Sequence, residues 1–208
     1  MTTKFKNLGR TGTVLSKKQV YDGPIFKLYK ETIKTPDGLE VERDLIDHGN
    51  AVTILAMTAD DQVVLGSEYR VGRNAETVSL PAGLINGDED PLVAAKRELQ
   101  EETGYVAHDS QVMTAITSSE GFTNETVTLV LTHIDANERA ERHFDHDEYV
   151  NTQLVPLAEV IAMMKRGEIR SAQGLCALNW YLNFVREPNQ WILMKNSLIW
   201  RRANHTMI

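Results

Sequence analysis

The chain has 208 residues, of which 42% are apolar and 25% are charged, and its formal net charge is -7. This balance is typical of one sizeable globular domain with at most a small annex, and it excludes a chain that is disordered throughout. The acidic charge also excludes a general binder of the nucleic-acid backbone, because that role needs an excess of lysine and arginine.

Cysteine usage and hydropathy indicate the compartment. The chain has a single cysteine, Cys176, so no disulfide can form within it, and a reducing environment is expected. Cys176 itself is expected to be a small buried residue. The N-terminal residues have no apolar core of signal-peptide length, and no stretch approaches the roughly 20 apolar residues of a membrane span. We therefore expect a cytoplasmic protein that binds no membrane.

Extended structure is predicted for the N-terminal part of the chain, with strands at 14–15, 25–35 and 39–46. The sequence Thr35-Pro36-Asp37-Gly38 is a strong turn signal, so the last two strands are expected to form a hairpin. Residues Ala51–Met57 are apolar enough for a central strand. A turn at Asp60-Asp61 then leads into another strand at 62–67.

The first helix is predicted to begin at Asp90-Pro91, because Asp is a good N-cap and Pro suits the first helical position. Gly104 is well placed to end it. Strands follow at 112–117, 126–134 and 153–155. Helices are then predicted at Leu157–Arg166, closed by Gly167, and from Ser171 to about Arg186. This mixture predicts an α/β fold, in which helices pack on a mixed sheet.

Three acidic side chains of the first helix carry the chemical signal. Glu98, Glu101 and Glu102 lie three and four residues apart, so they leave the helix from one patch. Like charges at this spacing cost roughly 0.2–0.5 kcal/mol on an exposed helix, and a divalent cation reverses that effect. Clustered carboxylates suit a hard ion such as Mg²⁺ or Mn²⁺. The alternative is a solvated acidic face on which Arg97 pairs with Glu101.

These residues belong to a longer pattern: Gly83, five residues, Glu89, seven residues, Arg97-Glu98-Leu99, one residue, Glu101-Glu102, one residue, Gly104. The pattern resembles the signature of the Nudix hydrolases, and every fixed position is filled. Tyr105 is the one departure, since an aliphatic residue usually stands at this packing position. Seven fixed residues at roughly 6% each make a chance match rarer than about one in a million.

The resemblance implies a Nudix-type α/β/α sandwich with a mixed sheet. It also implies a metal-dependent hydrolase that breaks a pyrophosphate linkage by attack of water on phosphorus. Mg²⁺ (or Mn²⁺) would be held by Glu98, Glu101 and Glu102 together with the carbonyl group of Ala82. Arg97 would orient these glutamates, and Glu89 would be a supporting carboxylate.

Segments outside the signature resemble one branch of that family, the ADP-ribose pyrophosphatases. They are the segments 43–48, 67–70, 80–83 and 119–125. In that branch, N-terminal strands form a small antiparallel sheet that helps to build a homodimer, and the substrate sits between the subunits. The implied reaction is hydrolysis of ADP-ribose to AMP and ribose 5-phosphate.

The same resemblance implies a set of substrate-binding residues, namely Arg43, Asp44, Arg70, Gly83 and Glu125. Arg43 and Arg70 could equally be surface cations. Two positions depart from the branch: Glu120 replaces a Pro that marks ADP-ribose preference, and Ser79 replaces a Glu. Another nucleoside diphosphate sugar or a dinucleotide therefore remains an alternative substrate. A further alternative is a module that senses nucleotides without cleaving them, although no signature carboxylate is missing.

The general base is expected in the acidic stretch 145–148, because acidic loops over a site can deliver one. In the branch that the chain resembles, a glutamate of this loop is the base, and alignment with that branch on 155–157 points to Glu148. A solvated acidic loop is the alternative. We divide the chain into an N-terminal β-sheet region at 1–49 for dimerisation and substrate, a Nudix domain at 50–187, and an apolar tail at 188–208. The tail is expected to pack on the body or on a partner subunit.

Overall fold

The computed structural model describes residues 9–142 and 150–186. The chain divides into two compact units. One consists of Met1–Ala51 with Ile116–Val127, and the other of Val52–Ala115 with Thr128–Ile208. Within the described ranges, no helix has the length and hydropathy needed to cross a membrane.

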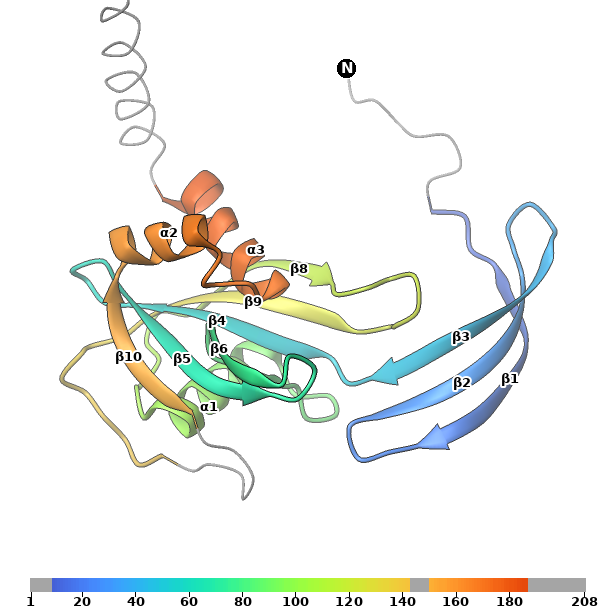
Figure 1. Ribbon diagram of the computed structural model, residues 1–208, viewed down its shortest axis with the longest axis horizontal. Coiled ribbons are helices and arrows are strands. Elements are labelled where there is room, and N and C mark those ends of the chain that lie inside the picture. Colours follow the sequence, from blue (N-terminus) through green and yellow to red (C-terminus); the bar gives the residue numbers. More distant parts are fainter. Residues whose placement is uncertain (1–8, 143–149, 187–208) are drawn as a thin grey trace, which may run out of the picture. The chain divides into compact units, whose positions relative to one another are not determined.

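The first unit is built on a three-stranded antiparallel sheet in the order β1-β2-β3 (Figure 1). The strands are β1 (Thr13–Asp22), β2 (Phe26–Lys34) and β3 (Glu40–His48). The predicted hairpin is confirmed, because the Gly38 amide donates to the Thr35 carbonyl at 2.9 Å and β2 and β3 pair along their whole length. Gly38 has a φ of 95°, a conformation that favours glycine.

The second unit is built on a seven-stranded mixed sheet whose main order is β10-β5-β4-β9-β8, with β6 paired to β5 and β7 to β4. Its strands are β4 (Ala51–Met57), β5 (Gln62–Arg70), β6 (Ala75–Ser79), β7 (Ala82–Leu84), β8 (Gln111–Thr117), β9 (Thr126–His133) and β10 (Asn151–Pro156). Five of these were predicted. Strands β6 and β7 were not.

The helices are α1 (Pro91–Thr103), α2 (Leu157–Arg166) and α3 (Ala172–Trp180). Figure 1 shows α1 on one face of the large sheet and α2 with α3 on the other. The ends predicted for α1 and α2 are confirmed. The helix predicted from Ser171 to about Arg186 is confirmed in its start and its extent, but its last five residues, Tyr181–Val185, form a π-helix.

The main hydrophobic core lies between α1 and the sheet. It contains alternate residues of β4, one apolar face of α1, and residues of β5 and β9, namely Val52, Ile54, Ala56, Val64, Ala94, Ala95, Leu99, Tyr105, Val130 and Ile134. Tyr105 is only 1% exposed, which confirms that its position is a packing one. This packing fixes α1, and therefore its acidic patch, against the edge of β7.

Cys176 is exposed on α3, so the expectation that it is buried was wrong. The buried residues of α3 are Gly174, Ala177 and Leu178. They share one face at helical spacing, and position 176 falls outside it. The exposure of Cys176 is therefore set by the side of α3 on which it lies, and not by the small size and low polarity of cysteine.

Candidate active site

The acidic patch is positioned by the caps of α1. The Asp90 side chain accepts a hydrogen bond from the Leu92 amide at 2.8 Å, and Pro91 occupies the first turn. At the other end Gly104 has a φ of 74°, and its amide donates to the Gln100 carbonyl. The helix therefore starts and stops where the sequence predicts, and the three predicted metal ligands lie in its last two turns.

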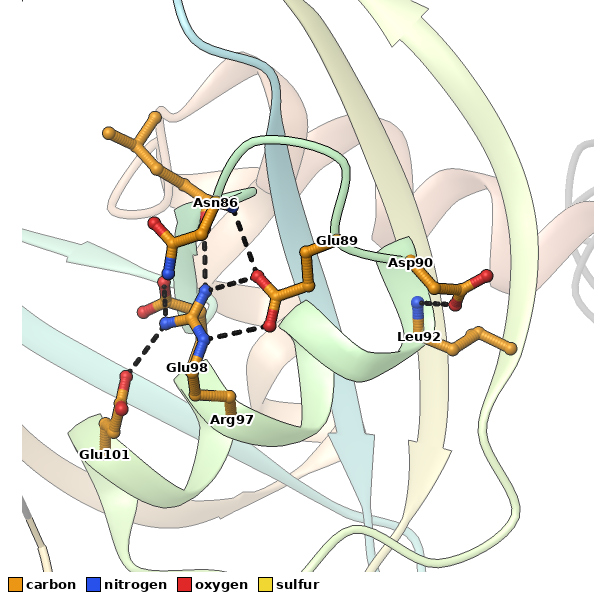
Figure 2. A network of polar contacts seen from close by, with 8 residues as sticks. Asn86, Glu89, Asp90, Leu92, Arg97, Glu98 and Glu101 are labelled. Atoms are coloured by element: carbon orange, nitrogen blue, oxygen red, sulfur yellow. Dashed lines mark hydrogen bonds and ion pairs between the residues drawn. The ribbon is translucent and has the colours of Figure 1, made fainter.

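Arg97 is the centre of the polar network on α1 (Figure 2). Its Nε and Nη2 atoms donate to the two oxygens of Glu89 at 3.1 and 2.9 Å, which is a bidentate pair. Its Nη1 atom donates to Glu98 at 2.7 Å and to Glu101 at 2.9 Å. Nη2 also donates to the Leu84 carbonyl at 2.9 Å, which ties the network to β7.

The network shifts the pKa values of Arg97 and Glu89 in the directions that favour their charged forms. The hydrogen bonds with Glu89 contribute most to raising the pKa of Arg97 above its usual range, and Glu98 and Glu101 add to the effect against the opposing effect of burial. The Arg97 hydrogen bond is the main cause that lowers the pKa of Glu89, followed by the bond from the Asn86 amide. Arg97 and Glu89 are therefore both ionised at neutral pH.

Gly83 leaves room for the Glu98 carboxylate. A Cβ built at position 83 would lie within 3.0 Å of all three carboxyl atoms of Glu98, closer than real Cβ atoms approach. Ala82 and Gly83 are half-buried in β7, beside the paired strand β4. The glycine is therefore explained by one side chain, since Glu98 fills the space that a methyl group would take.

The donor set fits a hard divalent cation in its chemistry. Glu98 and Glu101 converge on one cationic group, the Arg97 guanidinium, and both offer carboxylate oxygens. Glu98 fills the cradle at Gly83, and the neighbouring Glu102 is 8% exposed. In the described part of the chain, no three His, Cys, Asp or Glu side chains are arranged as a ready metal site. Arg97 holds the Glu98 and Glu101 carboxylates together, as a bound cation would also do.

The alternative to a metal site was a solvated acidic helix face on which Arg97 pairs with Glu101. That ion pair is present, at 2.9 Å. The rest of the patch does not behave as a solvated face. The Glu89 and Glu98 side chains are each only 15% exposed, and both bind the same arginine. Burying four charged side chains by half carries a desolvation cost, which the ion pairs to Arg97 must offset.

Three substrate candidates, Arg43, Asp44 and Glu125, lie in the first unit. Glu125 Oε1 lies 3.2 Å from His48 Nδ1, which is also 2.9 Å from the Gly49 carbonyl oxygen, and the side chains of Glu125 and His48 are largely buried. Asp44 is exposed and pairs with Lys30 at 3.2 Å, whereas the exposed Arg43 donates to the neighbouring Glu42 carbonyl. Glu120, which stands where the ADP-ribose pyrophosphatase branch usually has Pro, accepts a hydrogen bond from the Thr117 hydroxyl.

Asn124 organises this part of the unit and was not predicted as a site residue. Its side chain accepts from the His48 amide at 3.1 Å and donates to Asp47 at 2.6 Å. It thereby holds the 119–125 segment beside the end of β3. Asn124 and His48 both stand in the segments that carried the resemblance, but nothing in their spacing indicates that they meet.

The other substrate candidates lie in the second unit. Arg70 is at the end of β5, its side chain is 51% exposed, and it pairs with Glu68. The departing residue Ser79 is buried in β6 opposite Gly66. Glu148, the predicted general base, lies outside the described residues.

Comparison with known proteins identifies the family. The family model described as NUDIX domain matches residues 47–178. An ADP-ribose pyrophosphatase of Bacillus subtilis is 30% identical over 80% of this chain and 90% of its own length. One of Mycobacterium tuberculosis is 31% identical over 91% of this chain and 95% of its own. A GDP-mannose pyrophosphatase of Citrobacter koseri is 29% identical over 73% of this chain and 83% of its own.

A solved structure titled "Crystal structure of ADP compounds hydrolase" superposes with a TM-score of 0.70, covering 85% of this chain and 95% of that chain at 20% identity. This likeness confirms the predicted fold, with its mixed sheet and small antiparallel sheet. The matched domain and the two relatives at 30% and 31% identity lead to one conclusion: the chain belongs to the Nudix family and is a Nudix hydrolase of the ADP-ribose pyrophosphatase-like branch.

Proposed function

We propose that this enzyme hydrolyses ADP-ribose to AMP and ribose 5-phosphate with the help of Mg²⁺ or Mn²⁺. One water is consumed and one phosphorus–oxygen–phosphorus linkage is broken. The observation that carries the proposal is the convergence of Glu98 and Glu101 on Arg97, beside a glycine against which the Glu98 carboxylate packs. The names of two relatives, both ADP-ribose pyrophosphatases, support the substrate.

The proposed ion ligands come from the family resemblance, and the contacts of Arg97 and Glu89 support the arrangement. Glu98, Glu101 and Glu102, with the Ala82 carbonyl, would hold the ion. When bound, such an ion neutralises the diphosphate and polarises its phosphorus–oxygen bonds. Arg97 would orient Glu98 and Glu101, since it already donates to both. Glu89 would fix Arg97 through its bidentate pair.

The remaining roles rest on the family resemblance. Glu148 is proposed as the general base, and Arg43, Asp44, Arg70, Gly83 and Glu125 as substrate-binding residues. The His48–Glu125 pair supports the assignment of Glu125, because a largely buried carboxylate beside an imidazole offers directed polar groups. The exposure of Arg43 and Arg70 leaves their guanidinium groups accessible to an anionic ligand.

A homodimer is also proposed. The small sheet exposes many large apolar side chains, including Val14, Leu15, Val20, Tyr21, Ile25 and Phe26. Every residue of β1 is exposed. Apolar side chains gathered on one element indicate a protein contact surface.

The second candidate function is hydrolysis of another nucleoside diphosphate sugar. Two observations favour it: Glu120 and Ser79 depart from the ADP-ribose branch, and one relative is named a GDP-mannose pyrophosphatase. A sensing module that only binds would instead give no turnover of any such compound.

A substrate panel tests these proposals. The protein would be incubated with Mg²⁺ and ADP-ribose, GDP-mannose or another nucleotide sugar, and the products would be separated and quantified. We expect the highest kcat/KM for ADP-ribose, with AMP and ribose 5-phosphate in equal amounts. Faster turnover of GDP-mannose would replace the first candidate by the second. The variant Glu102→Gln serves as the inactive control, and full activity in it would reject the metal assignment.

A further inference from the structure

The C-terminal end of α1 has an electrostatic problem. Glu98, Glu101 and Glu102 occupy the last two turns, close to the negative end of the helix dipole. The last turn contains no basic residue of its own. Carboxylates in this place are repelled by each other and by the helix terminus. Arg97 of the same helix pairs with Glu98 and Glu101. Positive charge from outside the helix would stabilise the last turn further.

Two arginines from the segment 138–142 bring that charge. Arg139 Nη1 and Arg142 Nε both donate to the Thr103 carbonyl at 3.0 Å. Thr103 is fully buried, and its carbonyl is one of those that a helix end leaves without an intrahelical partner. Two charge-assisted hydrogen bonds on one such carbonyl cap the helix from outside.

The backbone of the same segment is fitted to the helix end. The Ala140 amide donates to the Gly104 carbonyl at 2.8 Å. A Cβ at Gly104 would lie 3.0 Å from the Ala140 carbonyl oxygen and 3.2 Å from Arg142 Cγ. The glycine that ends α1 thus also leaves space for the segment that caps it.

Tyr105 contacts the 138–142 segment through its ring and its backbone. The Arg139 guanidinium carbon lies 3.3 Å from the centre of the Tyr105 ring, a cation–π contact, and residues 105 and 139 form an antiparallel bridge. An aliphatic residue, usual at this position, offers no π face. The departure of Tyr105 from the family signature is therefore matched by Arg139, which uses the ring.

Arg142 also connects the helix end to the sheet. While Nε binds Thr103, Nη2 donates to the Thr152 hydroxyl of β10 at 2.7 Å. A rigid planar fork that binds two elements at once restrains both. The last turn of α1 is thereby tied to a strand of the large sheet.

We propose that Arg139 and Arg142, with Tyr105 as their platform, are positioning residues that hold the last turn of α1 so that Glu101 and Glu102 are preorganised for the ion. This inference rests on the proposed metal-dependent function. The two arginines act through the Thr103 carbonyl, directly after the two glutamates.

The test measures Mn²⁺ binding to the purified full chain without substrate. Electron paramagnetic resonance quantifies the Mn²⁺ that remains free. We expect Arg142→Gln to raise the Mn²⁺ dissociation constant by roughly 10–100-fold, the effect of removing an outer-shell partner of a metal site. The matched control is Arg166→Gln. Arg166 lies in the last turn of α2 and pairs with Glu159 and Glu168, so its loss also removes ion pairs at a helix end. Its Mn²⁺ affinity should equal that of the wild type.

A second pair of variants keeps the proposal testable if Arg142→Gln does not fold. Tyr105→Phe retains the π face and should retain the affinity, whereas Tyr105→Leu removes it and should weaken binding. Equal Mn²⁺ affinity in the wild type, Arg142→Gln and Tyr105→Leu, together with lower unfolding midpoints, would overturn the inference and leave these residues a purely structural role. Absence of Mn²⁺ binding in the wild type would instead reject the metal-dependent function itself.

Discussion

At position 83 a hydrogen atom stands where any other residue would place carbon against the Glu98 carboxylate. We expect Gly83→Ala to push that carboxylate away and to lower kcat/KM by about 100-fold, because a displacement of about 1 Å in a catalytic constellation has an effect of that size. Steady-state kinetics with Mg²⁺ checks this expectation. The control is Gly72→Ala, since a Cβ at Gly72 meets nothing within 4 Å. Similar kinetics in the two variants would contradict the proposed role of Gly83.

Glu89 gives a prediction about pH. Its bond from Arg97, and next that from the Asn86 amide, hold the pKa of Glu89 below its ordinary value of 4.5. A carboxyl whose pKa is depressed by folding stabilises the folded state above the unfolded pKa, and this stabilisation is lost as the pH falls through the folded pKa. The wild type should therefore lose more unfolding free energy than Glu89→Gln between about pH 7 and about pH 3.5. Urea titrations at the two pH values measure the difference, and equal losses would disprove the coupling.

Residue types and spacing predict chemistry better than they predict contacts. Glu98, Glu101 and Glu102 could be named because helical spacing places them on one patch. The bidentate pair of Arg97 with Glu89 spans eight residues and depends on the 86–90 turn, so spacing alone did not predict its form. The contacts of Asn124 with Asp47 and His48 join positions more than seventy residues apart, and only the fold brings them together.

At the scale of the element, α1 is the most predictable part of the chain because both of its ends are set by local chemistry. Asp90→Ala should lower the unfolding free energy by about 1 kcal/mol, the usual effect of losing an N-cap, while Asp90→Asn should retain most of it. Chemical denaturation measures both variants. Equal stability of Asp90→Ala and the wild type would show that the Leu92 amide finds another partner.

The elements that were missed are those that depend on distant pairing. Strands β6 and β7 are short, and β7 has only three residues, so neither carries a clear period of its own. They form because β5 and β4 offer them an edge. The change from α3 to a π-helix at Tyr181 is also invisible in the apolar spacing of 175–185, which fits an α-helix throughout.

At the scale of the whole molecule, the proposed homodimer can be tested directly by the mass of the particle in solution. If the small sheet forms the subunit interface, a charge among its exposed apolar side chains should oppose association. We expect Val20→Asp to shift the mass from a dimer to the 23.4 kDa protomer, measured by light scattering after size exclusion. Lys18→Asp, on the same strand, should remain dimeric. A wild type that elutes as a monomer would reject the dimer proposal directly.

The exposed position of Cys176 has a practical consequence. As the single thiol of the chain, it accepts a maleimide dye or a nitroxide at one defined place without any prior substitution. It stands on α3 in the unit that carries α1, away from the side of the helix that packs inward. A label at this position would mark the face of the large sheet opposite α1 (Figure 1), in the otherwise unaltered protein.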